Sequence, residues 1–230
     1  MLPLPSLDPP RPLYRIGRAP DPWAWPRWDY QHTDGTFGNR WDDPGARFRV
    51  IYAASQRLGS FLEVLARFRP DPAVIAGLSD IEGEDDALAP GRVPRSFLAA
   101  RVMGEAVVTG HFADIDAVDA LAHLREKLAG RLVHHEIDDL DASAIKGAQR
   151  AFTQEVAEYV YELTNPAGEA CYSGIAYASR LGDDQQNWAI FETPSPEAEA
   201  RLIERGDTRP ILDSDPDLRR AMELFHLELA

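Results

Sequence analysis

The spacing of apolar residues changes abruptly within one segment, FRVIYAASQRLGSFLEVLARF, residues 48–68. In FRVIY every second residue is Phe, Val or Tyr, and this alternation is typical of a strand. Beyond Ser55 the apolar residues recur every three or four positions, which predicts an amphipathic helix that ends before Pro70. Ser55 is the expected N-cap of that helix. The segment therefore favours a fold that combines sheet and helix.

Other segments repeat these two patterns in an irregular order. The strand patterns are LYRIG, FLAARVMGEAVVTG, GHFADI, GIAYAS and NWAIFE. The helix patterns are DAVDALAHLREKLAG, residues 143–163 and SDPDLRRAMELFHLELA. Because strands lie toward both ends of the chain without a regular strand–helix alternation, the expected class is α+β, a single domain with central β-sheets flanked by helices.

Composition divides the chain into three expected parts. Prolines are frequent in residues 1–12, which predicts an extended N-terminal arm. Residues 13–195 are expected to form the main domain, with an insertion at about 70–96 that carries prolines and an acidic run. Residues 196–230 are expected to form a C-terminal helical extension packed on the domain.

The charge balance excludes one class of partner. The 230 residues include 24 basic and 38 acidic side chains, which give a net charge of -14. Such a field repels polyphosphate, so no direct nucleic-acid partner is expected. The first 18 residues contain no uninterrupted apolar run, so neither a signal peptide nor a membrane span is expected. We expect a cytoplasmic protein, and a homo-oligomer remains open.

The common signatures of cofactor and metal chemistry do not occur in the sequence. Neither GxxxxGK[ST] nor GxGxxG is present, which removes the usual routes to ATP and Rossmann-type cofactors. Cys171 is the only cysteine, so an internal disulfide and a multi-cysteine metal site are excluded. His134 and His135 are adjacent, and adjacent side chains diverge on a strand or a helix. No metal is expected.

Three residues near the first strand and helix are candidates for a functional site. Arg40 lies in the turn GNRWDDPG, Tyr52 ends the strand, and Glu63 lies on the helix beside its apolar stripe. Each also has an ordinary structural explanation: a surface ion pair, a core aromatic or a solvated helix residue. On these residues alone the structural explanation is favoured.

Several blocks together resemble a known family. LYRIG, GNRWDDPG followed by VIYAASQRLGSFLEVL, TQEVAEYVYE, GIAYASR and NWAIFE are similar in order and chemistry to the RES-domain family. The resemblance covers scattered blocks over residues 12–192. It implies a fold similar to ADP-ribosyltransferase toxins, NAD as the substrate that is consumed, and an Xre-type helix-turn-helix antitoxin as a partner.

The resemblance also implies site residues. The family's arginine, tyrosine, glutamate and serine correspond to Arg40, Tyr52, Glu63 and Ser179, which would be catalytic. NAD would be bound by Arg15, Arg40, Tyr52 and Asn187. In this hypothesis Arg40 and Arg15 bind the pyrophosphate, Tyr52 stacks on the nicotinamide, and Ser179 hydrogen-bonds the ribose or the carboxylate of Glu63. Glu63 would stabilise the positive charge that develops as nicotinamide leaves.

The implied activity leaves several alternatives open. The leading hypothesis is a toxin of a toxin–antitoxin pair that releases nicotinamide from NAD by phosphorolysis or hydrolysis. A second is transfer of ADP-ribose to a target protein. A third is a catalytically silent module that binds a nucleotide or a partner. Because the whole chain is acidic and NAD is an anion, a pocket for NAD must supply its own positive field.

Overall fold

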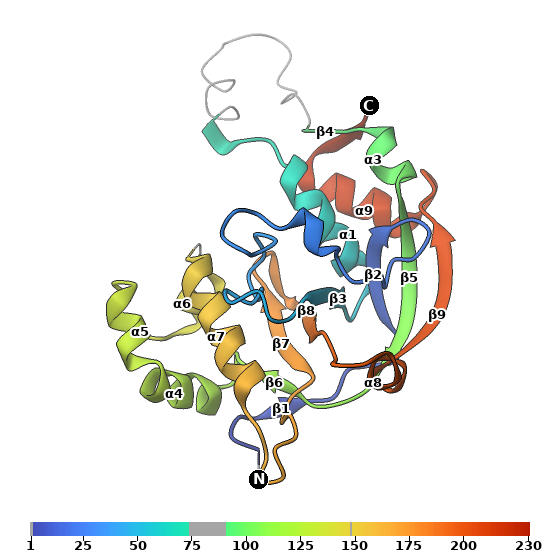
Figure 1. Cartoon of the computed structure of the whole chain (residues 1–230). Coiled ribbons are helices and arrows are strands. Elements are labelled where there is room, and N and C mark those ends of the chain that lie inside the picture. The colour runs from blue at the N-terminus through green and yellow to red at the C-terminus, as the bar shows by residue number, and fades with distance from the viewer. Residues whose placement is uncertain (1, 74–90, 148) are drawn as a thin grey trace.

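The computed structural model describes residues 2–73, 91–147 and 149–230 (Figure 1). Its centre is an eight-stranded curled sheet with the order β1-β6-β7-β8-β3-β2-β5-β9. All neighbouring strands are antiparallel except β6 and β7, which are parallel. The strands of this sheet are β1 Ser6–Leu7, β2 Leu13–Arg18, β3 Val50–Ala54, β5 Arg101–Val108, β6 Phe112–Asp114, β7 Gly174–Ser179, β8 Gly182–Phe191 and β9 Ile203–Pro210.

Helices flank this sheet in two groups, which confirms the predicted mixed class with a central sheet between helices (Figure 1). One group is α4 Val118–Lys127, α5 Ala129–His134, α6 Ala142–Lys146 and α7 Arg150–Glu162. The other is α1 Arg57–Leu65, α3 Arg95–Ala99 and α9 Pro216–Phe225, beside a small parallel sheet of β4 Gly91–Val93 and β10 Leu227–Leu229. Short helices η1 Trp28–Tyr30, η2 Ala66–Phe68 and α8 Pro196–Leu202 lie in connections.

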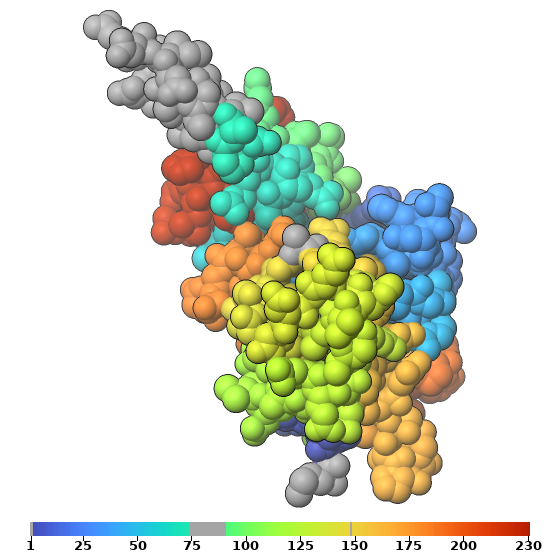
Figure 2. All heavy atoms as spheres, turned by 90° about the vertical axis from the view of Figure 1, so that its left-hand side faces the viewer, coloured from blue at the N-terminus to red at the C-terminus, as the bar shows by residue number. Residues whose placement is uncertain are grey.

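Each helix group buries its apolar stripe in a separate part of the core. Phe152, Val156 and Val160 of α7 are fully buried and pack with residues of α4 and β7. Phe61 and Leu65 of α1 are fully buried and pack against α9 and β2. Figure 2 looks onto the first group, where the side chains of α4 and α5, in yellow-green, face the viewer.

The strand β3 carries Tyr52, and its two neighbours in the sheet, β2 and β8, carry the candidate residues Arg15 and Asn187. Tyr52 on β3 is opposite Ala189 on β8, and Asn187 on β8 is opposite Tyr177 on β7. The helix α1 follows β3 after two residues and packs back on the sheet. The predicted strand and helix of residues 48–68 are therefore present and adjacent. Ser55 does not cap the helix, because Gln56 is the N-cap and the Ser55 hydroxyl accepts a hydrogen bond from Trp188 Nε1 at 2.9 Å.

The predicted helix over residues 143–163 is two helices. Gly147 has an extended backbone, with φ of -63° and ψ of -179°, and ends α6. The helix α7 begins at Arg150 and changes direction relative to α6. A Cβ at Gly147 would lie 2.9 Å from the carbonyl oxygen of Ser143, so a larger residue does not fit this break without a shift. The break separates Lys146, the last residue of α6, from Arg150, the first residue of α7.

Both ends of the chain take part in the large sheet. The N-terminal arm contains β1, which pairs with β6, and Tyr172 Oη donates to the carbonyl oxygen of Leu4 at 2.7 Å. The C-terminal segment was expected to be helical, but it also contains β9, which pairs with β5 as an edge strand. The expected insertion at about 70–96 falls largely outside the described residues. Within the described part of the chain, no helix combines the length and the apolar character needed to cross a bilayer.

Candidate functional site

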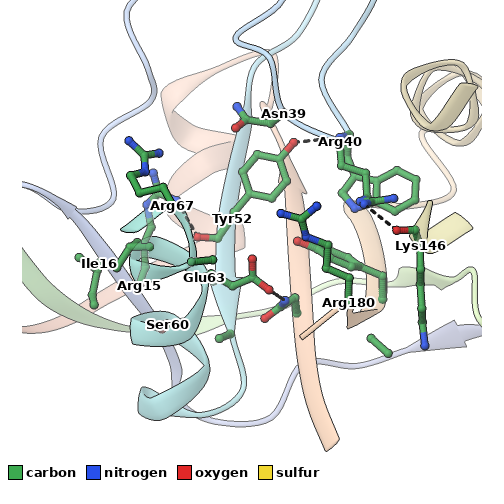
Figure 3. Close-up of a pocket in the computed structure, with 18 of the residues that line it drawn as sticks. Arg15, Ile16, Asn39, Arg40, Tyr52, Ser60, Glu63, Arg67, Lys146 and Arg180 are labelled. Atoms are coloured by element: carbon green, nitrogen blue, oxygen red, sulfur yellow. Dashed lines mark hydrogen bonds between the residues drawn. The ribbon is translucent and has the colours of Figure 1, made fainter. Parts of the chain in front are cut away.

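A cavity of about 390 Å³ opens between the two helix groups (Figure 3). Its size is within the range of about 300–1,000 Å³ that is usual for small-molecule sites. Five of the six predicted site residues line it, and the sixth, Ser179, hydrogen-bonds one of the five. The five are Arg15, Arg40, Tyr52, Glu63 and Asn187. Residues from six separate segments of the chain therefore meet in one place.

Glu63 is anchored by two donors from the sheet. Ser179 Oγ donates to Glu63 Oε1 at 2.6 Å, and Asn187 Nδ2 donates to the same oxygen at 2.8 Å. Within the described residues, Oε2 has no hydrogen-bond donor. Glu63 lies beside the apolar stripe of α1, and the residue is exposed and lines the cavity. One oxygen is thus fixed by the protein, and the other faces a space that a ligand can enter.

Ser179 and Asn187 are themselves held rigidly, since each is only 2% exposed. Of the two partners suggested for Ser179, the structure shows the carboxylate of Glu63. Its hydroxyl also accepts a hydrogen bond from the backbone of Leu181 at 3.0 Å, which fixes the direction of the O–H. Asn187 Oδ1 is buried and has no partner among the described residues.

Tyr52 is fastened at both its hydroxyl and its backbone. The hydroxyl donates to Asp42 Oδ1 at 3.1 Å and accepts from the backbone N–H of Trp41 at 3.0 Å. The carbonyl oxygen of Tyr52 accepts from Arg15 Nη1 at 2.6 Å. Burial, and then the negative charge of Asp42, raise the pKa of Tyr52 well above its ordinary value. The hydroxyl is therefore a neutral structural group, and the ring is what the residue presents to the cavity.

Arg15 and Arg40 donate to backbone carbonyl groups. Arg15 Nε donates to the carbonyl of Pro22 at 2.7 Å, in addition to its bond to Tyr52. Burial lowers the pKa of Arg15 to about 10. Arg40 donates through Nη1 to Ile145 and through Nη2 to Lys146, the latter at 3.0 Å (Figure 3). These carbonyls end α6, where a cation is favourable. Arg40 thereby ties its turn to the end of that helix.

The turn that carries Arg40 is organised by a carboxylate that the sequence did not single out. Asp42 Oδ2 accepts from the backbone N–H of Asn39 at 2.7 Å and of Phe37 at 3.0 Å. Its other oxygen accepts from Asn39 Nδ2 and from the Tyr52 hydroxyl. Asp42 is 3% exposed, so all four bonds are shielded from water. The sequence signal that could have found it is the acidic pair directly after the tryptophan in GNRWDDPG, because Asp side chains commonly accept from nearby backbone N–H groups in turns.

Basic side chains dominate the cavity wall. Among the residues that the structure describes, the lining contains one carboxylate, Glu63, and six basic side chains: Arg15, Arg40, Arg67, Lys146, Arg150 and Arg180. Burial and the nearby charges of Arg180 and Arg150 lower the pKa of Arg40. Sequence reasoning missed four of these six, although Arg180 is the last residue of GIAYASR. A chain of net charge -14 therefore carries a locally positive cavity.

Tyr177 on β7 also lines the cavity and was also missed, although GIAYASR contains it. Its ring lies edge-on to Trp41, with centroids 5.4 Å apart and planes at 61°. Burial, and then the charge of Glu63, raise the pKa of Tyr177 well above its ordinary value. No group of three or more His, Cys, Asp or Glu side chains in the described part of the chain is arranged to hold a metal ion. The site thus offers one carboxylate, aromatic rings and a positive field.

Comparison with known families adds a decisive match. The family model for the RES domain matches residues 12–214. The chain belongs to the RES domain family. No curated protein sequence matches the chain significantly. Among solved structures, this RES domain is similar to a chain of the M. tuberculosis MbcT-MbcA toxin-antitoxin complex, with a TM-score of 0.54 and 16% identity. The similarity covers 95% of this chain and 91% of that one, and at this identity it shows a shared fold.

The RES match includes more of the chain than the scattered motifs suggested. It runs beyond residue 195 to residue 214, so it takes in α8 and the edge strand β9. It also includes the turn 38–45 and all six predicted site residues. The cavity of the RES domain is therefore built wholly within the matched region.

Proposed function

We propose that this RES domain is an enzyme that releases nicotinamide from NAD and acts as the toxin of a toxin–antitoxin pair. The observation that carries the proposal is the anchored carboxylate: Glu63 Oε1 is held by Ser179 and Asn187, and Oε2 faces a cavity lined by six basic side chains. Membership of the RES family supports NAD as the substrate. The structural relative is part of a toxin–antitoxin complex, which supports an antitoxin partner for this chain, and we propose one of the Xre type.

The chemistry requires one bond to break. The bond between the nicotinamide nitrogen and ribose C1′ is cleaved, and its electron pair leaves with the nitrogen. The ribose carbon becomes positively charged until phosphate or water attacks it. A fixed carboxylate near this carbon stabilises the charge more strongly in the transition state than in the ground state. Glu63 has the position and the freedom of one oxygen for this role, while the rings of Tyr52 and Tyr177 form walls for the leaving group.

The test removes the negative charge of Glu63 and retains the shape of its side chain. We expect Glu63→Gln to lower the rate of nicotinamide release by about 10²- to 10³-fold, as for loss of a preorganised electrostatic group. Glu204→Gln is the matched control, because Glu204 is exposed on β9 and outside the cavity. Its rate should equal that of the wild type. Nicotinamide is measured by chromatography, and near-normal release by Glu63→Gln would disprove the role of this carboxylate.

The nature of the acceptor is tested with the same protein. NAD is incubated with and without inorganic phosphate, and the products are identified by mass spectrometry. ADP-ribose 1-phosphate indicates phosphorolysis, and ADP-ribose indicates hydrolysis. A mass increase on an added protein fraction would instead support transfer of ADP-ribose to a target. No nicotinamide under any of these conditions, together with unchanged NAD, would favour a binding module and refute the proposed activity.

A further inference from the structure

The six basic side chains of the cavity differ in what they already bind. Four of them are engaged by protein groups. Arg15 and Arg40 donate to backbone carbonyls, Arg150 donates to the carbonyl of Gly38, and Lys146 Nζ pairs with Asp183 Oδ1 at 2.6 Å. Arg67 and Arg180 form neither a hydrogen bond nor an ion pair with any described residue, although the Arg67 guanidinium carbon lies 5.9 Å from the centre of the Phe97 ring. Their donors are free for a ligand.

The backbone directs Arg67 away from Glu63, the acidic residue four positions earlier. Residues 63 and 67 are four apart, and a glutamate and an arginine at this spacing commonly pair on a helix. Here α1 ends at Leu65, and the chain tightens into η2, so Arg67 is turned out of register with Glu63. Figure 3 shows Arg67 and Arg180 on opposite sides of Tyr52 and Glu63. The two guanidinium groups thus flank the residues that we propose to act on the glycosidic bond.

The positive charges that line the cavity repel one another. Arg40 is close enough to Arg180 and Arg150 for their charges to disfavour its protonated form. Glu63, the one carboxylate among the described lining residues, already accepts hydrogen bonds from Ser179 and Asn187 and offsets little of this repulsion. A bound anion offsets this repulsion, and the surrounding positive charges stabilise the anion. Arginine is well suited to this because its planar guanidinium donates two parallel hydrogen bonds to a phosphate.

We infer that Arg67 and Arg180 bind the pyrophosphate of the dinucleotide, whereas Arg15 and Arg40 shape the cavity by holding backbone carbonyls. The inference rests on the proposed function for the identity of the dinucleotide. It revises the expectation that Arg40 and Arg15 bind the pyrophosphate. Because the charge of the pyrophosphate does not change when the glycosidic bond breaks, these contacts stabilise the bound substrate and the transition state alike. Their loss should therefore raise KM and leave kcat nearly unchanged.

The experiment compares Arg67→Gln, Arg180→Gln and the double variant with the wild type. Arg201→Gln is the control, since Arg201 is exposed on α8, lies outside the cavity, and its loss changes the net charge equally. Each single variant should raise KM for NAD by about 10- to 100-fold, the usual value of a charge-assisted hydrogen bond. The rate at which these variants cleave nicotinamide riboside, which has no phosphate, should differ from the wild-type rate by less than about twofold, because no phosphate contact is lost.

Binding of ADP, measured by calorimetry, tests the anion site without any reaction. We expect ADP affinity to fall in both single variants and not in the control. If ADP binding depends on both arginines but no variant releases nicotinamide, the inference stands and the proposed function fails. If nicotinamide is released and KM is unchanged in the double variant, the inference alone fails. If the variants cleave nicotinamide riboside as poorly as NAD, the substitutions have distorted the cavity, and this result would also overturn the inference. Arg→Lys variants that restore part of the ADP affinity would support the inference.

Discussion

Two charged regions of this molecule are built in opposite ways. The outer network joins the turn to α5 and α7, and each of its arginines is paired: Arg47 with Asp43, Glu158 and Glu162, and Arg131 with Glu155 and Glu158. The cavity instead collects six basic side chains around one carboxylate. Paired charges with a buried member hold elements together, whereas a surplus of one sign favours a ligand of the other. The difference separates stability from binding, and it can be tested.

The largest effect is expected in the outer network. Arg47→Gln leaves Asp43, whose side chain is fully buried, without its charged partner. Breaking a buried pair in this way commonly costs about 3–5 kcal/mol, and the partial exposure of Arg47 reduces our expectation to about 2 kcal/mol of unfolding free energy. Urea denaturation followed by circular dichroism measures it. If the loss is no greater than for Arg201→Gln, the network does not stabilise the fold.

Acid should reduce the difference in unfolding free energy between the wild type and Arg47→Gln. Burial alone would raise the pKa of Asp43, but hydrogen bonds from Arg47 and Gly45 hold it below its ordinary value. A depressed folded pKa contributes stability above the unfolded pKa of about 4, and this contribution is lost as the pH falls further. The unfolding free energy of the wild type should therefore exceed that of Arg47→Gln most near neutral pH, and the difference should shrink progressively below about pH 4. Urea midpoints across this range test it, and a constant difference would contradict the assigned role of Asp43.

A smaller effect is expected from Tyr52→Phe, which keeps the ring and removes the hydroxyl. The variant loses the hydrogen bonds to Asp42 and Trp41, so we expect about 1–2 kcal/mol less unfolding free energy. The rate of nicotinamide release should remain close to that of the wild type, because the hydroxyl already forms hydrogen bonds with Asp42 and Trp41. A large loss of rate at unchanged stability would show that the hydroxyl takes part in the chemistry.

The smallest effect is expected in the cavity, with the opposite sign. Arg180→Gln removes one of several like charges and breaks no hydrogen bond or ion pair with a described residue, so it should raise stability by a few tenths of a kcal/mol at low salt. The gain should disappear as salt is added, and thermal melts at two ionic strengths measure it. Destabilisation as large as that of Arg47→Gln would remove the distinction between the two regions.

Local patterns predicted the elements that carry the site, and the family motifs predicted which residues meet there. The strand β3 and the helix α1 follow from apolar spacing, because one face of each is buried. Apolar spacing does not show that Glu63, Ser179 and Asn187 share hydrogen bonds, since Glu63 is separated from the other two by more than a hundred positions. Only the order of the motifs connected them.

Other features lacked any local signal. The strand β9, IERGDTRP, is exposed along nearly its whole length, so it shows no apolar alternation. The break at Gly147 interrupts a continuous apolar stripe and is marked by a single glycine. Lys146 and Arg150 reach the cavity because of that break, and Arg67 because of the η2 turn. Such placements depend on tertiary packing, which short windows of sequence do not contain.

Asp42 and Asp43 are consecutive, yet the first fastens Tyr52 and Asn39 beside the cavity and the second anchors Arg47 on the outside. A protein engineer cannot treat these two positions independently. Attempts to raise thermal tolerance without altering turnover should leave residues 38–47 as they are. Remote solvent-facing positions are better choices, such as Val118 at the start of α4, which is 80% exposed.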